Sequence, residues 1–174
     1  LGVQVHWAET PDEACRIIHG IISAHNGKLM VKGKSMVSEE IELNHYLAEH
    51  GVKAVESDLG EFIVQMAGEK PTHIVMPAIH KTKEQVSELF HQNLGTPLTD
   101  DVDQLTGFAR QALRDIYRTA DVGLSGVNFA VAETGTLCLV ENEGNGRLST
   151  TVPPVHIAIT GIEKVVAKLT DIPP

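Results

Sequence analysis

Residues 28–67 read KLMVKGKSMVSEEIELNHYLAEHGVKAVESDLGEFIVQMA, a stretch that alternates between strand-like and helix-like segments. Two short, mostly apolar runs, Lys28–Lys32 and Val52–Glu56, have the length of strands. The sequence predicts a helix from Ser38 to Gly51 after the first run and another from Asp58 to about Ala67 after the second. A strand, a helix and a second strand in this order are typical of a right-handed βαβ unit with parallel strands.

The same alternation extends over the rest of the chain. Thr10-Pro11-Asp12-Glu13 starts a helix that runs to about His25, because it combines a capping hydroxyl, a proline at the first helical position and acidic residues in the first turn. Further strands are predicted at Gly2–Trp7, Thr72–Met76, Phe129–Ala132, Leu137–Val140 and Val155–Thr160, and further helices at residues 82–91, at residues 101–120 and from Ile162. The expected fold class is therefore α/β, with a mostly parallel sheet in a single domain, residues 1–174.

The amino-acid composition favours a helix-covered parallel sheet and argues against nucleic-acid-binding and membrane proteins. Hydrophobic residues make up 42% of the 174 residues and aromatic residues only 4%, so the core is aliphatic, as in a parallel sheet covered by helices. The net charge is −9 and no basic stripe is apparent in the sequence, which argues against a nucleic acid or an anionic membrane as partner. The longest apolar runs are too short to span a bilayer.

The cysteines and histidines predict no metal site. Cys15 and Cys138 are the only cysteines, and the nine histidines form no HExxH or other metal-binding spacing. Two isolated thiols fit a reducing cytoplasm. The chain begins with Leu1, directly in a strand pattern and without a signal segment, so we expect it to be a piece excised from a longer protein.

Residues that follow the predicted strands are the first site candidates, because ligands of open α/β sheets bind beyond the carboxyl ends of the strands. Lys34 and Ser35 follow one strand, Glu56 and Asp58 follow the next, and His80 follows the predicted strand at 72–76. Lys34 could hold a carboxylate or a phosphate, and His80 could act as a catalytic titrating group. The plainer interpretations are a solvated lysine, a structural histidine and, for Asp58, a helix N-cap.

Residues 128–147 read NFAVAETGTLCLVENEGNGR, two strand-like pieces whose turns are unusually polar. We interpret these turns as part of a site for a small polar or anionic molecule, and a hairpin with a polar loop is the alternative. The ligand-binding candidates are Asn128, Thr134, Gly135, Thr136, Asn142, Glu143, Asn145 and Arg147. Glu133 is the candidate general base, beside turn amides that could hold an anion. We expect both turns to line one cleft with Lys34 and Asp58.

Two nucleotide-binding motifs are excluded. Gly33-Lys34-Ser35 has the ending of a phosphate-binding loop, but position 28 is lysine where G-x-x-x-x-G-K-S requires glycine. No GxGxxG occurs either, so the dinucleotide fingerprint is missing.

Four motifs carry a family resemblance: residues 33–40 (GKSMVSEE), 56–63 (ESDLGEFI), 126–136 (GVNFAVAETGT) and 142–145 (NEGN). In this order they resemble the lactate-utilisation protein B family and, more broadly, the LUD domain, from about Val31 to Lys164. The resemblance implies a three-layer Rossmann-like α/β fold, similar to glucosamine-phosphate deaminases, ribose-phosphate isomerases and CoA transferases. It also implies a subunit of a bacterial complex that oxidises L-lactate to pyruvate in the cytoplasm, with sister subunits as partners.

Members of that family continue into a ferredoxin-like region whose cysteines hold two [4Fe–4S] clusters. Two cysteines cannot ligate even one such cluster, so we expect no cofactor in this chain and clusters only in the full-length protein. The leading hypothesis is a LUD domain that binds a small carboxylate or docks sister subunits, and that is inactive as an isolated domain. An independent sugar-phosphate isomerase or CoA-transferase-like enzyme, with Glu133 as base or nucleophile, and a non-catalytic scaffold domain are the alternatives.

Overall fold

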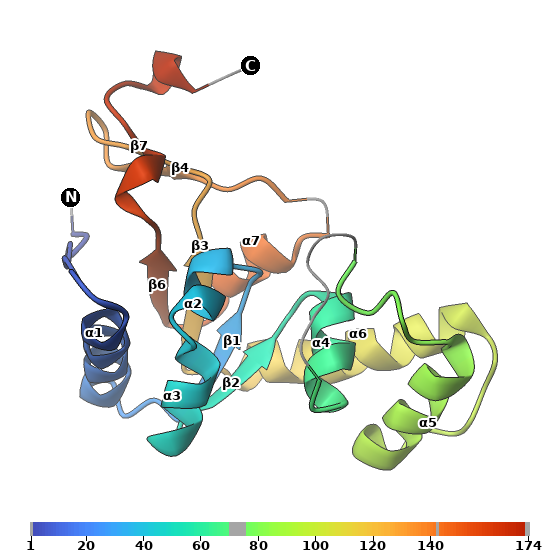
Figure 1. The fold of residues 1–174 in the computed structure, drawn as a ribbon. Coiled ribbons are helices and arrows are strands. Elements are labelled where there is room, and N and C mark those ends of the chain that lie inside the picture. The colour runs from blue at the N-terminus through green and yellow to red at the C-terminus, as the bar shows by residue number, and fades with distance from the viewer. Residues whose placement is uncertain (1, 70–75, 142, 173–174) are drawn as a thin grey trace.

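A four-stranded parallel sheet forms the centre of the fold in the computed structural model, which describes residues 2–69, 76–141 and 143–172 (Figure 1). Its strands are β1 (Leu29–Lys32), β2 (Lys53–Glu56), β3 (Val122–Gly126) and β6 (Val155–Ile159), in the order β2-β1-β3-β6. Because all neighbouring pairs are parallel, the carboxyl ends of the four strands lie at one edge of the sheet, which we call the carboxyl edge. The predicted α/β class with a mostly parallel sheet is confirmed.

Helices cover both faces of this sheet. The helices are α1 (Pro11–Ala24), α2 (Met36–Glu40), α3 (Leu43–Glu49), α4 (Leu59–Met66), α5 (Lys83–Leu94), α6 (Val102–Thr119) and α7 (Asn145–Thr151). Successive residues of a strand point to opposite faces, so Met30 packs with α1 and α3, whereas Val31 packs against Tyr117 and Ala120 at the end of α6. A second apolar cluster joins α4, α5 and α6. These layers match the three-layer architecture that the resemblance implies (Figure 1).

Local sequence signals account for most helix starts. The side chains of Thr10, Asp58, Thr82 and Asp101 each accept a hydrogen bond from a backbone N–H in the first turn of α1, α4, α5 and α6, respectively. Thr82 and Gln85 also form a capping box, in which each side chain accepts a hydrogen bond from the other residue's backbone N–H. Among the described residues, no helix is both long enough and apolar enough to cross a membrane.

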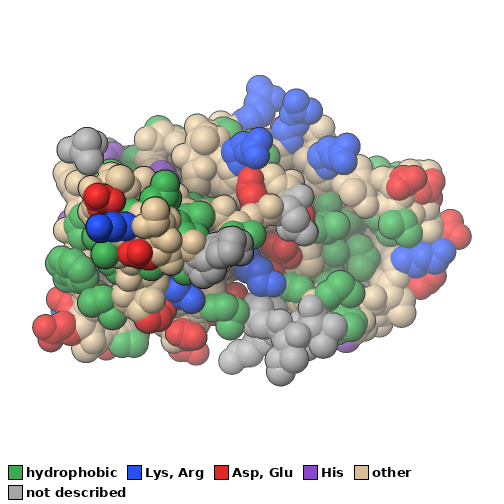
Figure 2. Space-filling view, turned by 90° about the horizontal axis from the view of Figure 1, so that it is seen from above, with side chains coloured by type: hydrophobic (Ala, Val, Ile, Leu, Met, Phe, Trp, Pro, Cys, Tyr) green, Lys and Arg blue, Asp and Glu red, His purple; other side chains and the backbone are tan. Residues whose placement is uncertain are grey.

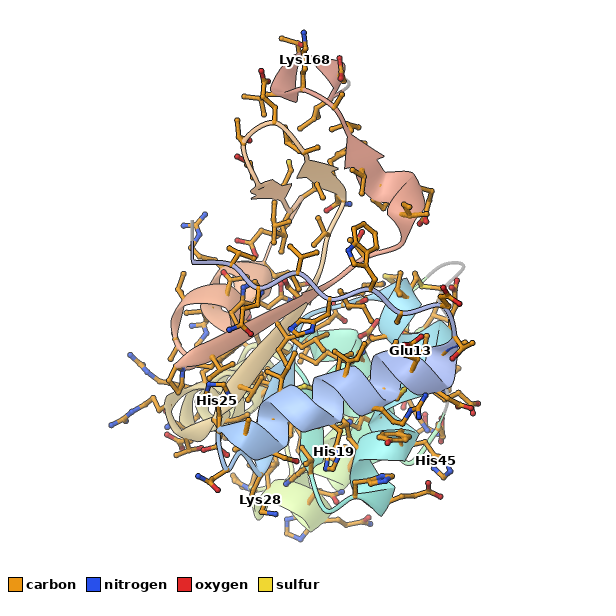
Figure 3. The ribbon with its side chains drawn as sticks, turned by 90° about the vertical axis from the view of Figure 1, so that its left-hand side faces the viewer. Glu13, His19, His25, Lys28, His45 and Lys168 are labelled. Carbon is orange, nitrogen blue, oxygen red and sulfur yellow. The ribbon has the colours of Figure 1, made fainter. Side chains whose placement is uncertain are left out.

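A second, smaller sheet stands away from the main sheet. It consists of β4 (Phe129–Val131), β5 (Thr136–Cys138) and β7 (Val165–Val166), in the order β5-β4-β7, with β4 and β5 antiparallel. We call residues 127–140 and 160–172, which carry this sheet, the arm. The arm projects above the body of the molecule, with Lys168 near its far end (Figures 1 and 3). Several of its apolar side chains are exposed, including Leu137, Val140 and Leu169.

The structure differs from the sequence predictions at both ends of the chain. The predicted strand Gly2–Trp7 is not formed, because this segment pairs with no strand among the described residues and Val3, Val5 and Trp7 are exposed. Alternating apolar residues alone do not make a strand when no neighbour supplies hydrogen bonds. The predicted last helix is also wrong. Residues 162–164 form one 3-10 turn, and the chain then pairs with β4 as β7.

Three internal elements also differ from the predictions. The predicted helix from Ser38 to Gly51 is divided into α2, capped by Ser35, and α3, with Glu42 in a left-handed conformation at the junction. Strand β3 and helix α7 were not predicted, since a glycine-containing strand and a polar Asn-Gly helix start both have the composition of loops. The predicted strand at 72–76 falls largely on residues 70–75, which lie outside the described residues.

A short basic stripe on α6 also went unrecognised in the sequence. Arg110, Arg114 and Arg118 are four residues apart and exposed, so they lie on one face of the helix. Figure 2 shows basic side chains gathered along one margin of the molecule, whereas its centre carries both charges.

Gly123 is the point at which α7 lies closest to the sheet. A Cβ atom at this position would collide with the backbone carbonyl of Ser149 and approach Cγ of Pro153 at 3.1 Å. Gly123→Ala is therefore expected to lower the free energy of unfolding by about 2 kcal/mol or more, because backbone must move to make room. Urea denaturation of the variant measures this loss. Gly20→Ala is the control, since nothing lies within 4 Å of a Cβ there, and equal stability of the two variants would contradict the prediction.

Candidate functional site

A buried charged cluster lies at the carboxyl edge, where β1 and β2 end side by side. Lys32 is the last residue of β1 and pairs in register with Glu56, the last residue of β2. Lys32 is only 1% exposed, its Nζ lies 2.9 Å from Oε1 of Glu56, and it donates to Oγ of Ser38 at 2.9 Å. Nδ2 of Asn44 donates to the same Glu56 oxygen at 2.7 Å. Two donors on one oxygen favour the ionised form of Glu56.

Glu61 completes what we call the buried triad, Lys32, Glu56 and Glu61. It lies in the first turn of α4, where Asp58 caps the helix, and is 2% exposed. Burial raises the pKa of Glu61 to about 8, and both the negative charge of Glu56 and a hydrogen bond with Glu56 act in the same direction. A hydrogen bond between two carboxyl groups requires a proton on one of them. Glu61 therefore carries that proton at neutral pH and donates it to Glu56.

A cavity of about 430 Å³ opens beside the triad, between α2, α3 and α4. Its lining includes both carboxyl groups of the triad and side chains from all three helices: Ser38, Glu39, Glu42, Leu43, Asn44, His45, Glu56, Glu61, Gln65 and Glu69. Figure 3 shows His45 on the outer side of α3. The lining is rich in carboxylates toward solvent, whereas Lys32 compensates charge at the buried end.

Lys34, Asp58 and Glu143 form a second polar group next to the triad. The side chain of Lys34 is 44% exposed, and its Nζ atom lies 3.8 Å from Oε1 of Glu61. Burial and the charge of Asp58 raise the pKa of Glu143, whereas Lys34 and a hydrogen bond from the backbone N–H of Leu59 lower it. The segment after β5 therefore approaches the carboxyl ends of β1 and β2.

Tyr117 ties α6 to this segment. Its side chain is buried, and its hydroxyl donates to the carbonyl oxygen of Asn145 at 3.1 Å. Burial raises the pKa of Tyr117, and hydrogen bonds with Ser57 and Ser149 lower it. Asn145 in turn donates through Nδ2 to Glu143 at 3.3 Å.

The structure places the hairpin candidates elsewhere. Glu133, Thr134, Gly135 and Thr136 are exposed on the arm, where the two threonine hydroxyls bond to each other at 2.7 Å. Oδ1 of Asn128 accepts the backbone N–H of Val140 at 2.8 Å and so closes the other end of this hairpin. The single expected cleft is thus divided, because β4 carries the chain away from the carboxyl edge.

The remaining candidates have local partners. The hydroxyl of Ser35 caps α2 by accepting the N–H of Ser38 at 3.2 Å. Arg147 is 79% exposed, and its Nε lies 3.6 Å from Glu141 in a shallow depression of about 580 Å³ between β5 and α7. His80 is half-exposed and bonds to Glu69 at 2.6 Å, which also pairs with Lys81. Asn142 lies outside the described residues.

Four residues of the site went unrecognised in the sequence: Lys32, Ser38, Asn44 and Tyr117. The sequence predicts Lys32 only as the last residue of a strand, yet it also contains a pattern that indicates the ion pair with Glu56. The two predicted strands KLMVK and VKAVE end in opposite charges, and charged ends of adjacent parallel strands meet when the register aligns them. Glu61 also has a local role, since its backbone N–H donates to the N-cap Asp58 in the first turn of α4.

The chain does not fit an iron–sulfur cluster. Cys15 is buried in α1, where its thiol donates to the carbonyl of Ile41 at 3.4 Å, and Cys138 lies on β5 in the arm. A [4Fe–4S] cluster requires four thiolates, and this chain has two that occupy separate parts of the fold. Within the described ranges, no group of three or more His, Cys, Asp or Glu side chains could hold a metal ion.

Comparison with known proteins identifies the family. The family model described as LUD domain matches residues 1–173. The chain is 46% identical over 172 residues to lactate utilization protein B of Bacillus pumilus and 45% identical over 171 residues to the protein of that name in Bacillus cytotoxicus. It is 42% identical over 171 residues to the uncharacterized electron transport protein YkgF of Escherichia coli.

These alignments cover 98% of the chain but only 36% of each relative, so the chain spans about a third of the length of the curated relatives it matches. No solved structure matches the chain. The family-model match over nearly the whole chain, together with the parallel sheet and its flanking helices, shows that the chain belongs to the LUD domain family.

Proposed function

We propose that this LUD domain binds a small hydroxycarboxylate, with L-lactate as its first candidate, within an electron-transfer protein that oxidises lactate to pyruvate. The proposal takes its substrate class from the relatives named lactate utilization protein B and its electron-transfer role from the relative named as an electron transport protein. The iron–sulfur clusters and sister subunits that complete such a system would lie outside this chain.

The observation that carries the proposal is the position of Lys34 beside Glu61. The exposed ammonium of Lys34 lies 3.8 Å from a carboxyl group that keeps its proton at neutral pH. A protonated Glu61 does not neutralise the lysine, so the positive charge remains available to a carboxylate ligand.

The same geometry disfavours the isomerase or CoA-transferase alternative. That alternative assigns the base or nucleophile to Glu133, which is exposed on the arm outside the polar group at the carboxyl edge. A nucleophile of that kind needs an activating neighbour and a substrate pocket. Glu133 therefore has no support from the geometry as a catalytic group within this chain.

Lys34→Gln is expected to weaken binding of L-lactate to this chain by about tenfold or more at pH 7, because the variant loses a charge-assisted contact. Isothermal titration calorimetry measures the affinity. Lys53→Gln is the matched control, since Lys53 is an exposed lysine at the opposite end of the neighbouring strand. Unchanged affinity in Lys34→Gln, or no binding of lactate to the wild-type chain, would overturn the proposal.

A further inference from the structure

Two buried oxygen atoms of the cavity meet no N–H or alcohol donor among the described residues. They are Oε2 of Glu56 and Oδ1 of Asn44. Glu56 is 6% exposed, its other oxygen is occupied by Lys32 and Asn44, and both Glu56 and Asn44 line the cavity. A buried acceptor without a donor costs free energy, so the empty space beside these atoms favours an occupant that donates hydrogen bonds.

Within the buried triad, the acid proton of Glu61 is one hydrogen-bond donor available to Glu56. Glu61 and Glu56 are hydrogen-bonded to each other, and Lys32 and Asn44 hold Glu56 in its ionised form. The cavity therefore presents one carboxylic acid that donates and one carboxylate that accepts, next to each other at its buried end.

Few chemical groups complement such a pair. An alcohol hydroxyl accepts one hydrogen bond and donates another, a carbonyl oxygen only accepts, an ammonium only donates and a methylene does neither. We infer that the Glu56–Glu61 pair recognises the hydroxyl of a small hydroxycarboxylate, which enters between the two carboxyl groups. The hydroxyl accepts the hydrogen bond that Glu61 otherwise donates to Glu56, and it donates its own proton to Glu56. The inference rests on the proposed function, because Lys34 supplies the contact for the carboxylate. In a 2-hydroxy acid the two groups are on adjacent carbons, which suits an ammonium 3.8 Å from Glu61.

The charges around the cavity favour a hydroxyl over a cation at this position. The charged and titratable groups that face Glu61 or line the cavity are Lys32, Lys34, Glu39, Glu42, His45, Glu56 and Glu69. At the buried end, the charge of Glu56 is already balanced by Lys32, and Glu61 is neutral. A cation there would have to displace the proton of Glu61, whereas a hydroxyl leaves every charge in place.

Four ligands that differ at one atom test the inference. L-lactate, pyruvate, L-alanine and propionate share the three-carbon carboxylate and carry a hydroxyl, a carbonyl, an ammonium or hydrogen at the second carbon. Calorimetric titration of the chain at pH 7 is expected to show L-lactate binding at least about tenfold more tightly than the other three, since each alternative leaves a buried polar group unmet.

The outcomes separate the two proposals. Equal affinities for L-lactate and propionate overturn hydroxyl recognition but leave the carboxylate site at Lys34 intact. Tightest binding of L-alanine overturns it in favour of a cation site. Absence of binding for all four overturns the proposed function together with the inference.

Variants of Glu61 give an independent measurement. Glu61→Gln retains an N–H donor and is expected to keep the preference for lactate at pH 7, whereas Glu61→Leu is expected to lose it. Above pH 8, wild-type Glu61 ionises and can no longer donate, so lactate affinity should fall in the wild type and stay constant in Glu61→Gln. Glu40→Gln, at an exposed position of α2 that does not line the cavity, is the control that should follow the wild type. A parallel fall in Glu61→Gln would overturn the inference even if Glu61→Leu does not fold.

Discussion

Replacement of Lys32 by methionine is expected to lower the free energy of unfolding by about 3–5 kcal/mol at pH 8. Methionine has a similar volume but no charge, so Glu56 would keep its buried position and lose the ammonium 2.9 Å away. Ser38 would lose its donor as well. An uncompensated buried carboxylate is among the most costly changes that a single substitution makes.

The loss should depend on pH, which distinguishes it from a packing defect. Without Lys32, the buried carboxylate of Glu56 has no compensating charge, and protonation of the carboxylate removes that cost. The variant is therefore most stable at low pH, where Glu56 is protonated in both states, and loses stability as pH rises. Urea denaturation between pH 4 and pH 8 measures this slope. Lys28→Met is the control, since Lys28 is exposed at the opposite end of β1 (Figure 3). A pH-independent loss in Lys32→Met would contradict the charge argument.

The second large effect is a decline in the stability of the wild-type chain as pH rises from about 5 to 9. The pKa of Glu61 is about 8 in the folded chain, against an ordinary value of 4.5. Between these values the unfolded chain has lost the proton and the folded chain still holds it. The contribution of Glu61 to the free energy of unfolding is therefore fully present below pH 4.5. It is lost as pH rises toward 8, by an amount on the order of 4 kcal/mol.

Glu61→Gln should remove this decline, because glutamine carries no charge at any of these pH values. The variant is expected to be more stable than the wild type at pH 8 and to differ little from it at pH 5. Chemical denaturation of both proteins across this range measures the difference. Glu42→Gln, a change at an exposed cavity residue, should leave the slope as it is in the wild type. An equal slope in Glu61→Gln and wild type would assign the decline to other groups.

Local signals in the sequence were sufficient for most of the body of the molecule. Proline and acidic residues after Thr10 fix the start of α1, and the capping box at Thr82 fixes the start of α5. The strands Leu29–Lys32 and Lys53–Glu56 follow from apolar runs bounded by turns. Such signals act within a few residues, so they do not depend on contacts with distant parts of the chain.

Elements that depend on distant partners could not be predicted in this way. β3 contains two glycines, one of which is required by the backbone of α7, so its composition reflects packing more than strand propensity. β7 is a strand only because β4 lies beside it. Conversely, the residues Gly2–Trp7 alternate as a strand should, but no strand of the described chain pairs with them.

The candidate site likewise has a part that could be predicted from topology and a part that depends on contacts between distant residues. The strand-end rule points to the segments after β1 and β2, next to which the buried triad lies, because that rule depends only on topology. It did not identify Lys32 or Asn44, because their importance comes from burial and from contacts between three elements. The hairpin at 133–136 is polar in the same way as a ligand loop, and only its place on the arm distinguishes it.

The arm gives the domain two levels of thermodynamic stability. Its three strands contain only three, three and two residues, and many of its apolar side chains are exposed. A sheet of this size has little independent stability, whereas the four-stranded sheet is buried between helices. The arm therefore unfolds locally at a lower free energy than the body. Any molecule that held the arm in its observed conformation would bear the entropic cost of ordering it, and the buried triad would remain folded throughout.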